Sequence, residues 1–184
     1  MKILLLTIFI IVPMSSLANN LAPENSLLTA FDDQSPNLRW RVLNDSVMGG
    51  RSRGGFSVDD GILLFTGATN TNGGGFSSIR TRTRELRLQD QDEGLHMRIR
   101  GDGRTYTFVL ESEDLRATYW AFFPTVKDEW LDLRLPFTEF WPNWRGMRLD
   151  GPLLDKPAID ALGIMIYDNQ DGDFKLEVDW IKSY

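Results

Sequence analysis

Apolar and polar residues alternate with a period of two along most of this chain. Every second residue is apolar in the stretches 95–99, 131–135 and 174–178. Successive side chains of a strand point to opposite faces, so this alternation predicts half-buried strands with one face in water. Further apolar runs predict strands at residues 38–43, 61–67, 76–82, 105–111, 118–123 and 163–168.

Turn-forming residues separate these runs at roughly the 8–12-residue spacing that is typical of a sandwich or a barrel. The sequences DDG at 59–61 and GDG at 101–103 predict tight hairpins, because glycine accepts a positive φ at little cost. One short helix is expected within the segment 156–163, with Pro157 near its start and Gly163 just past its end. We therefore predict an all-β fold, a sandwich of two antiparallel sheets packed face to face, with one or two short helices.

The N-terminal residues follow a different pattern. A positive charge at Lys2, an apolar run at 3–12 and a small residue at Ala18 are typical of a secretory signal peptide. The run is too short to span a bilayer as a helix, which needs about 20 residues. We expect residues 1–18 to be cleaved, leaving 19–184 as a single exported domain in a bacterial periplasm. An uncleaved N-terminal anchor is the alternative.

The composition narrows the possible partners. The chain has 184 residues, a formal net charge of −6 and no cysteine. An acidic protein is a poor general binder of nucleic acid or of anionic lipid, so neither is expected as a partner. Without cysteine the fold cannot use disulfides, and its stability must come from an ordinary core. We expect a monomer that does not insert into a membrane once the signal peptide is removed.

No catalytic group of residues can be assembled from the sequence. The segment GRSRG at 50–54 matches the nucleophile-elbow pattern, which needs a strand before Ser52, a helix after it and a histidine base nearby. The residues that follow predict a strand instead, and the only histidine, His96, lies on the polar side of another strand. The glycines at 49–50 and 73–75 lack the Lys-Ser/Thr ending of a phosphate-binding loop. We therefore expect no enzyme.

Metal ligands are scarce. One histidine and no cysteine cannot form a zinc site. Asp168, Asp171 and Asp173 fail the EF-hand spacing but could hold calcium in another geometry. A plain acidic turn is the alternative, and no other cofactor is expected.

Arginines recur at every second position of two predicted strands. They are Arg80, Arg82 and Arg84 in the first strand, and Arg98 and Arg100 in the second, with Arg104 after it. If both strands lie in one sheet, this stripe could bind a carboxylate, a phosphate or an acidic partner. The alternative is cross-strand pairing with acidic residues, namely Glu85, Glu111, Glu113 or Asp114.

Two tryptophans, Trp141 and Trp144, lie outside any clean alternation in the segment 139–149. On a loop they could stack against sugar rings or anchor a protein partner. They could also cap the open end of the sandwich core.

Five segments carry a specific combination of motifs. They are WRVLNDSVMGGRS (40–52), LLFTGATNTNGGGFSSIRT (63–81), IRGDGRTYTF (99–108), LPFTEFWPNWRGMRLDGPLLD (135–155) and ALGIMIYDNQDGDFKLEVDWIKSY (161–184). In this order they resemble the complex I intermediate-associated protein 30 family. The resemblance implies a galactose-binding-domain-like jelly roll, related to carbohydrate-binding modules. It also implies a non-enzymatic role like that of the assembly factors that help to build respiratory complex I.

The resemblance places four motifs on this chain. They are Asn44, Asp45, Met48, Gly49, Gly50 and Ser52; then Gly75, Phe76, Ser78 and Arg80; then Gly101, Asp102 and Gly103; and finally Arg145 and Gly146. We interpret the first motif as a fold-defining loop that doubles as a binding rim. Our hypothesis is that Arg80 closes this loop by charge-assisted bonds to Asp45.

Together these observations predict a binding protein. The residues expected to form its binding surface are Asn44, Asp45, Gly49, Gly50, Ser52, Arg80, Arg98, Arg100, Trp141, Trp144 and Arg145. The favoured function is a non-enzymatic exported protein that binds other proteins, as an assembly factor or a chaperone does. The alternative is a carbohydrate-binding module of the periplasm, with a glycan as its partner.

Overall fold

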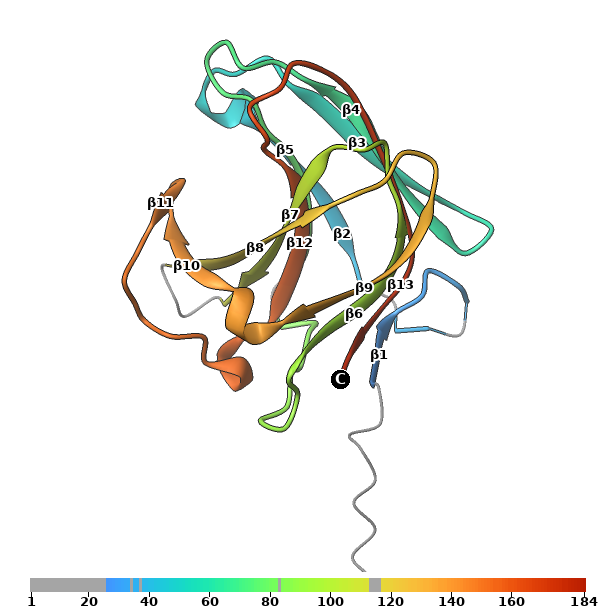
Figure 1. The fold of residues 1–184 in the computed structure, drawn as a ribbon, viewed down its shortest axis with the longest axis vertical. Helices are drawn as coiled ribbons and strands as arrows, with labels where there is room; N and C mark the ends of the chain where they lie inside the picture. The colour runs from blue at the N-terminus through green and yellow to red at the C-terminus, as the bar shows by residue number, and fades with distance from the viewer. Residues whose placement is uncertain (1–25, 34, 37, 83, 113–116) are drawn as a thin grey trace, which may run out of the picture.

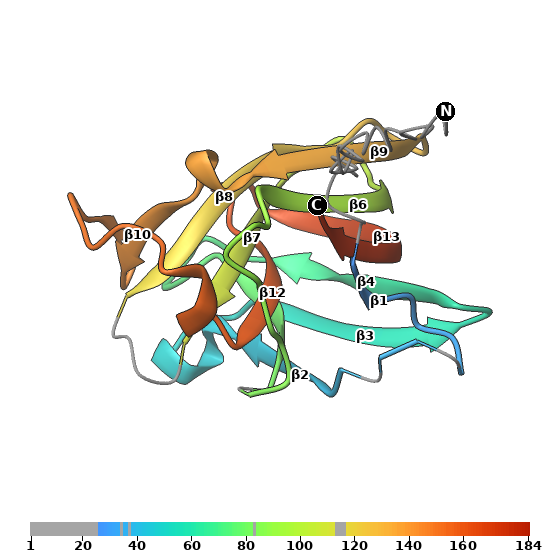
Figure 2. The same cartoon turned by 90° about the horizontal axis from the view of Figure 1, so that it is seen from below.

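Two antiparallel β-sheets pack face to face around an apolar core (Figure 1). The computed structural model describes residues 26–33, 35–36, 38–82, 84–112 and 117–184, so the expected signal peptide lies outside the described residues. Figure 2 shows the layer of β3, β4, β13, β6 and β9 beside the layer that contains β2, β12, β7, β8 and β10. The all-β sandwich predicted from the alternating pattern is confirmed.

The first sheet has six strands within the described residues, in the order β3-β4-β13-β6-β9, with β1 also paired to β13. Their bounds are β1 (Ser26–Thr29), β3 (Arg53–Asp59), β4 (Ile62–Thr69), β6 (Gly94–Arg100), β9 (Trp130–Pro136) and β13 (Gly172–Ser183). The long strand β13 pairs with β4 through its first half and with β1 through its last residues. The first described strand, β1, therefore lies beside the last one, β13.

The second sheet has seven strands in the described part of the chain, in the order β11-β10-β8-β7-β12-β5-β2. Their bounds are β2 (Trp40–Asn44), β5 (Ser77–Thr81), β7 (Thr105–Glu111), β8 (Thr118–Pro124), β10 (Trp141–Trp144), β11 (Met147–Arg148) and β12 (Ala161–Ile166). Three short 3-10 helices are described, η1 (Asp45–Met48), η2 (Phe137–Glu139) and η3 (Lys156–Ala158). None of the helices in the described residues is long and apolar enough to cross a membrane.

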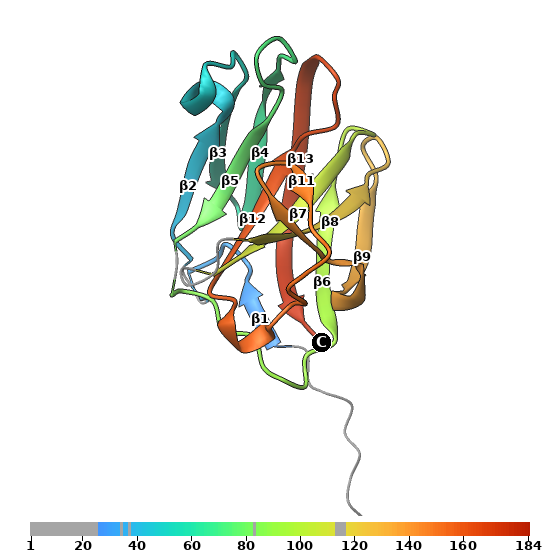
Figure 3. The ribbon, with the colours of Figure 1, turned by 90° about the vertical axis from the view of Figure 1, so that its left-hand side faces the viewer.

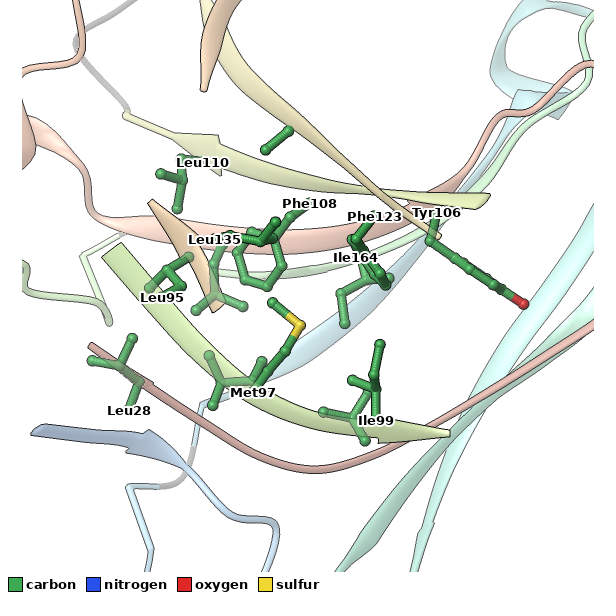
Figure 4. Packing of buried hydrophobic residues seen from close by; sticks show 14 of the residues in the cluster. Leu28, Leu95, Met97, Ile99, Tyr106, Phe108, Leu110, Phe123, Leu135 and Ile164 are labelled. Carbon is green, nitrogen blue, oxygen red and sulfur yellow. The ribbon is translucent and has the colours of Figure 1, made fainter. Parts of the chain in front are cut away.

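The core lies where the inward residues of the two sheets meet. Met97 and Ile99 of β6 point toward Phe108, Phe123 and Ile164 of the opposite sheet (Figure 4), and all five are fully buried. Burial of one such side chain stabilises the fold by about 1.5–3 kcal/mol. The alternation in the sequence therefore identifies the core face of these strands correctly.

The two predicted hairpins have different outcomes. The DDG segment at 59–61 does connect the paired strands β3 and β4. The GDG segment at 101–103 is not a hairpin, because β6 and β7 belong to different sheets. Its glycines permit a close crossing instead: a Cβ at Gly101 would lie 2.4 Å from the side chain of Thr125, and Gly103 has φ 92°.

The predicted helix at 156–163 is wrong. Only Lys156–Ala158 form a single 3-10 turn, and Ala161–Ile166 form the central strand β12. Gly163 ends no helix but lies inside this strand, opposite Arg80 of β5. Pro157 does lie near the start of a short 3-10 turn, but Gly163 marks no break, because β12 pairs with β5 and β7 through this residue.

The segment 139–149 is also more regular than the sequence predicts. It forms strands β10 and β11, which are joined by a two-residue turn at Arg145 and Gly146. These residues have φ values of 51° and 85°, as a two-residue hairpin of this kind requires. Trp141 and Trp144 therefore lie on β10, next to the edge strand β11 of the second sheet, and not on a loop.

Candidate functional site

A groove of about 630 Å³ lies on the outer face of the seven-stranded sheet. Its lining residues are Leu43, Val47, Met48, Gly74, Phe76, Arg80, Trp120, Arg145, Gly146, Met165 and Tyr167. Figure 3 looks onto this side of the molecule, with η1 at the upper left and the β10–β11 hairpin nearer the middle. The floor of the groove is the sheet itself, and its rims come from η1 and the β10–β11 turn.

A row of paired residues crosses the floor. Arg80, Gly163, Val109, Trp120 and Trp141 lie opposite one another on β5, β12, β7, β8 and β10. Directly paired residues point to the same face of a sheet. The residues on either side of them in each strand, such as Ile79 and Phe108, face the core. This register therefore places one arginine and two tryptophans on the outer face.

Arg80 is a buried cation, only 5% exposed, in this row. Its Nη1 donates to a carboxylate oxygen of Glu111, and its Nε donates to the hydroxyl of Ser78 at 2.6 Å. Its Nη2 lies 3.9 Å from the sulfur of Met165. Burial lowers the pKa of Arg80, while the charge of Glu111 raises it. The guanidinium is thus fixed in place at the floor of the groove, whose other lining residues, apart from Arg145, are apolar or glycine.

Aromatic rings form the rest of the floor and one wall. Trp120 packs against Trp141 and Tyr167, with ring centroids 5.5 and 6.2 Å apart. Tyr167 in turn meets Phe76 edge to face at 6.4 Å. The indole N–H of Trp120 donates to Thr118 Oγ1 at 2.8 Å. This small cluster is separate from the main core and covers the outer face of β7, β8 and β12.

The rims of the groove expose apolar side chains. Val47 and Met48 on η1 are each 68% exposed. Trp144 and Met147 on the β10–β11 hairpin are also exposed but do not line the groove, whereas Arg145 does line it and stacks over the ring of Trp144. Exposed apolar groups that gather around a hollow mark interaction sites more often than isolated ones do. The groove is therefore the strongest candidate for a binding surface.

Asp45 holds the rim helix in place. Its carboxylate is fully buried and accepts hydrogen bonds from Ser52 N (2.9 Å), Ser52 Oγ (2.6 Å) and Gly75 N (2.7 Å). Burial raises the pKa of this carboxyl, but these hydrogen bonds outweigh burial and hold the pKa below its usual value. A Cβ at Gly50 or Gly74 would lie 2.2 or 2.4 Å from atoms of the Asp45 carboxylate. The two glycines therefore let the chain close around the anion.

Asn44 extends this support to the strands. Its side-chain amide donates to Gly54 O at 3.2 Å, and its oxygen accepts from Ser77 Oγ at 2.6 Å. The C-terminal end of η1 is Gly49, with φ 87°. These contacts agree with the expectation of a fold-defining loop. That Asn44, Asp45, Gly49, Gly50 and Ser52 also take part in binding stays a prediction.

The expected contact between Arg80 and Asp45 is not formed. Arg80 pairs with Glu111, and Asp45 is held by donors of residues 52, 75 and 76. The reason is the register, because the Arg80 side chain leaves the outer face of β5 toward β12 and β7. The cross-strand alternative is therefore correct for this arginine.

The expected arginine stripe is wrong, because its two strands lie in different sheets. Arg98 and Arg100 are on β6, in the six-stranded sheet, whereas Arg80 is on β5. Arg98 pairs with Asp179 (3.3 Å) and Arg100 with Glu177 (2.8 Å), and both lie over the ring of Trp130. Only Arg80 and Arg145 of the predicted binding arginines line the groove.

The proposed calcium ligands do not form a cage together. Both oxygens of Asp168 accept from Arg104, at 2.9 and 2.6 Å, and Asp171 Oδ1 accepts from Thr71 N at 2.6 Å. Asp173 contributes its backbone carbonyl to Arg104. In the described part of the chain, no group of three His, Cys, Asp or Glu side chains is placed to hold a metal ion. The three carboxylates therefore do not converge on one site in this structure.

Ser52 and His96 are far from forming a catalytic pair. The hydroxyl of Ser52 donates to Asp45, and Ser52 is buried. His96 is on β6 of the other sheet and packs edge to face on Trp180, with ring centroids 4.7 Å apart. The nucleophile-elbow pattern is thus explained by the Asp45 contact.

Several groove residues were missed from the sequence, notably Val47, Trp120, Met165 and Tyr167. A signal was present, because the runs at 118–123 and 163–168 are apolar at positions of both parities. A strand that is apolar on both faces is covered on both faces. Strands that are apolar on both faces predict an apolar outer surface on the second sheet.

Comparison with known proteins identifies the family. The model of the family Complex I intermediate-associated protein 30 (CIA30) matches residues 29–178. The chain belongs to this family. The matched range contains η1, the Asp45 contacts, the β10–β11 turn and the whole lining of the groove.

Curated relatives carry the same name. Mouse "Complex I intermediate-associated protein 30, mitochondrial" is 33% identical over 97 residues, covering 47% of this chain and 29% of that protein. The probable CIA30 protein of Caenorhabditis briggsae is 31% identical over 97 residues, covering 49% and 28%. The match spans less than a third of the length of either relative. An "uncharacterized protein" of Schizosaccharomyces pombe is 29% identical over 168 residues, covering 78% and 77%.

Solved structures share the fold at low identity. The family 11 carbohydrate-binding module from Clostridium thermocellum, in complex with a β-1,3-1,4-mixed-linked tetrasaccharide, has a TM-score of 0.58 at 15% identity, covering 86% of this chain and 94% of that one. A CBM29-2 mutant complexed with cellulohexaose has a TM-score of 0.56 at 10% identity, covering 87% and 90%. These likenesses confirm the galactose-binding-like jelly roll that the resemblance implies.

The comparisons overturn one prediction. Export to a bacterial periplasm was expected from the N-terminal pattern, but the CIA30 relatives from mouse and nematodes are named as mitochondrial proteins. The periplasmic localisation is therefore wrong. A short cationic and apolar N-terminus does not by itself identify the compartment to which a protein is directed.

Proposed function

We propose that this CIA30-family chain is a non-catalytic protein-binding factor that holds an apolar segment of a partner protein in the groove. The observation that carries the proposal is the chemistry of the groove lining. Apart from Arg80 and Arg145, every lining residue is aliphatic, aromatic, methionine or glycine. Burial of apolar surface is the main favourable term in most protein association. The names of the relatives, which associate them with intermediates of complex I, support a role in assembly.

The exposed rim supports a polypeptide partner. Val47 and Met48 lie on a single 3-10 turn whose backbone is fixed by Asp45, while their side chains remain in water. Methionine adapts its shape to different apolar partners. A rigid turn with adaptable side chains can therefore bind apolar segments without a large loss of its own backbone entropy.

The charge of the groove favours an acidic group beside the apolar segment. The formal net charge of the chain is −6, yet both charged residues of the groove lining are arginines. Charge complementarity of this kind mainly sets orientation and the rate of association. Arg145, at the exposed turn, is the first cation that an incoming acidic side chain would meet.

The test is site-specific crosslinking in cells that express the chain. A photoreactive benzophenone amino acid replaces Met48 in one variant and Val58 in a control, since Val58 is exposed on β3 of the other sheet. The proposal expects a defined adduct from position 48 only, with a partner that mass spectrometry identifies as a subunit of a complex under assembly. Equal labelling from both positions, or none from position 48 of the folded protein, would refute the proposal.

Carbohydrate binding is the second candidate. The observation in its favour is the row of aromatic side chains on the outer face of a sheet whose fold matches carbohydrate-binding modules. It ranks second because Trp120 is only 8% exposed, and a ring must present its face to stack against a sugar. Calorimetric titration with the mixed-linked tetrasaccharide and with cellulohexaose tests this candidate. Heat of binding that is lost in Trp120→Ala would favour it over the protein-binding function.

The domain organisation is also part of the proposal. We propose that the chain after residue 18 forms a single domain. The described strands of both sheets contribute to one main apolar cluster, which supports this division. Limited proteolysis that leaves a stable fragment starting near residue 19 is the expected result.

A further inference from the structure

The guanidinium of Arg104 lies inside a cage of oxygen atoms at one end of the sandwich. Asp168 Oδ2 lies 2.9 Å from Nε, and Asp168 Oδ1 lies 2.6 Å from Nη2. The remaining oxygens are Gln170 O (2.9 Å) and Thr69 Oγ1 (3.0 Å) at Nη2, and Gly172 O and Asp173 O (each 3.1 Å) at Nη1. Hydrogen bonding to Asp168 raises the pKa of Arg104, with burial opposing it.

These oxygens are the ligand types that hard cations take. Calcium binds 6–8 oxygens from carboxylates, backbone carbonyls and hydroxyl groups or water, at about 2.3–2.6 Å. The Arg104 cage offers one carboxylate with both oxygens, three backbone carbonyls and one hydroxyl. Three of the oxygens surround Nη2 at 2.6–3.0 Å, so an inward shift of up to roughly 0.5 Å would bring these three to calcium distances. The other three contact Nε or Nη1 and must move further once the side chain is removed.

We propose that Arg104 occupies the place of a structural divalent cation, and that removal of its side chain converts the oxygen cage into a calcium site. The guanidinium is a cation supplied by the chain itself. It neutralises Asp168 and satisfies three inward carbonyls that would otherwise repel one another. The wild-type protein therefore needs no calcium at this end, whatever the groove binds.

The location explains why a cation is needed here. The cage joins the end of β4 through Thr69, the start of β7 through Arg104 and the β12–β13 turn through Asp168. The backbone carbonyl of Arg104 also accepts from Thr125 Oγ1 at 2.8 Å, which ties in the end of β8. Backbone segments from both sheets thus meet around a single positive charge.

The test compares wild-type protein with Arg104→Ala by thermal unfolding and by terbium luminescence. Wild-type Tm is expected to be the same in excess EDTA and in millimolar calcium. Arg104→Ala is expected to have a lower Tm, which calcium at about 100 times its Kd raises by about 5 °C or more. Bound terbium is expected to be excited by the nearby Tyr106, whose hydroxyl donates to Asp102 Oδ2 at 3.1 Å.

Three further variants make the test specific. Arg104→Ala/Asp168→Asn lacks the cage carboxylate and is expected to lose the calcium response. Arg53→Ala removes an exposed arginine of β3 and is expected to gain none. Arg104→Lys keeps a positive charge and is expected to fold without calcium and to ignore it.

Two results would overturn the proposal. The first is a wild-type Tm that falls in EDTA, because the end of the sandwich would then already use a metal. The second is a folded Arg104→Ala that shows no calcium response. If Arg104→Ala does not fold alone, recovery of the folded state in about 10 mM calcium supports the proposal, and failure to recover overturns it.

Discussion

The side chain of Arg80 runs across Gly163, where an added Cβ would lie 2.1 Å from Arg80 Cδ and 2.8 Å from Arg80 Nε. Because Gly163 has no side chain, the Arg80 side chain of β5 can pass over β12 and contact Glu111 of β7. A cation is brought to the groove floor because a central strand lacks a side chain at that one position.

Gly163→Ala is therefore expected to destabilise the fold, although alanine is ordinarily the better strand residue. The methyl group must displace Arg80, and overpacking of this kind costs about 1–3 kcal/mol. Gly55→Ala on β3 is the matched control, since an added Cβ there meets nothing within 4 Å. Chemical denaturation of both variants measures the difference. Equal stabilities would show that Arg80 can move aside freely.

The ion pair between Arg80 and Glu111 gives a second prediction. Glu111→Ala leaves Arg80 buried without its carboxylate, which is expected to cost about 3 kcal/mol. The double variant Arg80→Met/Glu111→Leu replaces the pair with apolar side chains beside Met165 and is expected to recover most of that loss. Urea denaturation of wild type and both variants tests this. A double variant that is less stable than Glu111→Ala would contradict it.

Two charged side chains of opposite sign, Asp45 and Arg104, bind the loops at one end of the sandwich. The Asp45 carboxylate is surrounded by N–H and O–H donors, and the Arg104 guanidinium is surrounded by oxygens. Thr71 N donates to Asp171 Oδ1 at 2.6 Å, which connects the β4–β5 loop to the β12–β13 turn. Charge-assisted hydrogen bonds therefore stabilise the loops that carry the rim of the groove.

Asp45→Asn tests the first of these charges. Loss of the charge and a misplaced amide donor are expected to cost about 1–3 kcal/mol near pH 7, because buried donors lose their acceptor. Hydrogen bonding holds the folded-state pKa of Asp45 below its usual value, so its contribution to stability is present above the unfolded pKa. The contribution is lost as pH falls through the folded pKa.

The measurement is the free energy of unfolding of wild type and Asp45→Asn between about pH 7 and pH 3. The gap between them is expected to close on the acid side. Asp59→Asn, at an exposed residue of the β3–β4 hairpin, serves as the control and is expected to stay close to wild type throughout. A gap that widens toward acid would contradict the prediction.

The sequence predicts the sandwich well and the groove poorly, for physical reasons. Leu95, Met97 and Ile99 alternate with polar residues, so their strand and its buried face follow from the period alone. The pairing of β5 with β12 depends on contacts between residues far apart in the chain. Local patterns do not specify such contacts, and for that reason Gly163 was assigned to the end of a helix.

The loop of the first motif, at residues 44–52, was predicted in part. The two glycine clusters and Asp45 indicated a tight turn, and the structure places them in one hydrogen-bonded unit. The partner of Asp45 was wrong, because a charge–charge contact with Arg80 was expected. The Ser52 hydroxyl and three backbone N–H groups satisfy the carboxylate instead. A backbone N–H donor does not depend on the residue type, so the sequence does not reveal it.

His96 gives a prediction on the other sheet. Burial lowers the pKa of His96, and Arg134 and Lys182 lower it further, while Asp132 raises it. The histidine is thus harder to protonate in the folded state than in the unfolded state. Its contribution to stability is present above the unfolded pKa of 6.5 and is lost as pH falls through 6.5 toward the folded pKa.

His96→Phe keeps the ring beside Trp180 and removes the titration. Wild type is expected to lose stability relative to this variant between about pH 7 and pH 5, as measured by denaturation at a series of pH values. Parallel pH profiles of the two proteins would show that His96 titrates alike in both states.

The exposed rim of the groove gives the last prediction, which separates binding from folding. Val47→Gln/Met48→Gln places polar groups at two positions that are each 68% exposed, so the free energy of unfolding is expected to change by less than about 0.5 kcal/mol per site. Affinity for the crosslinked partner is expected to fall by about tenfold or more, since each lost apolar contact contributes about 1 kcal/mol. Leu153→Gln is the control, because Leu153 is the most exposed of the large apolar residues described and does not line the groove. Equal affinities of the double variant and the control, both fully folded, would mean that the partner binds elsewhere on the molecule.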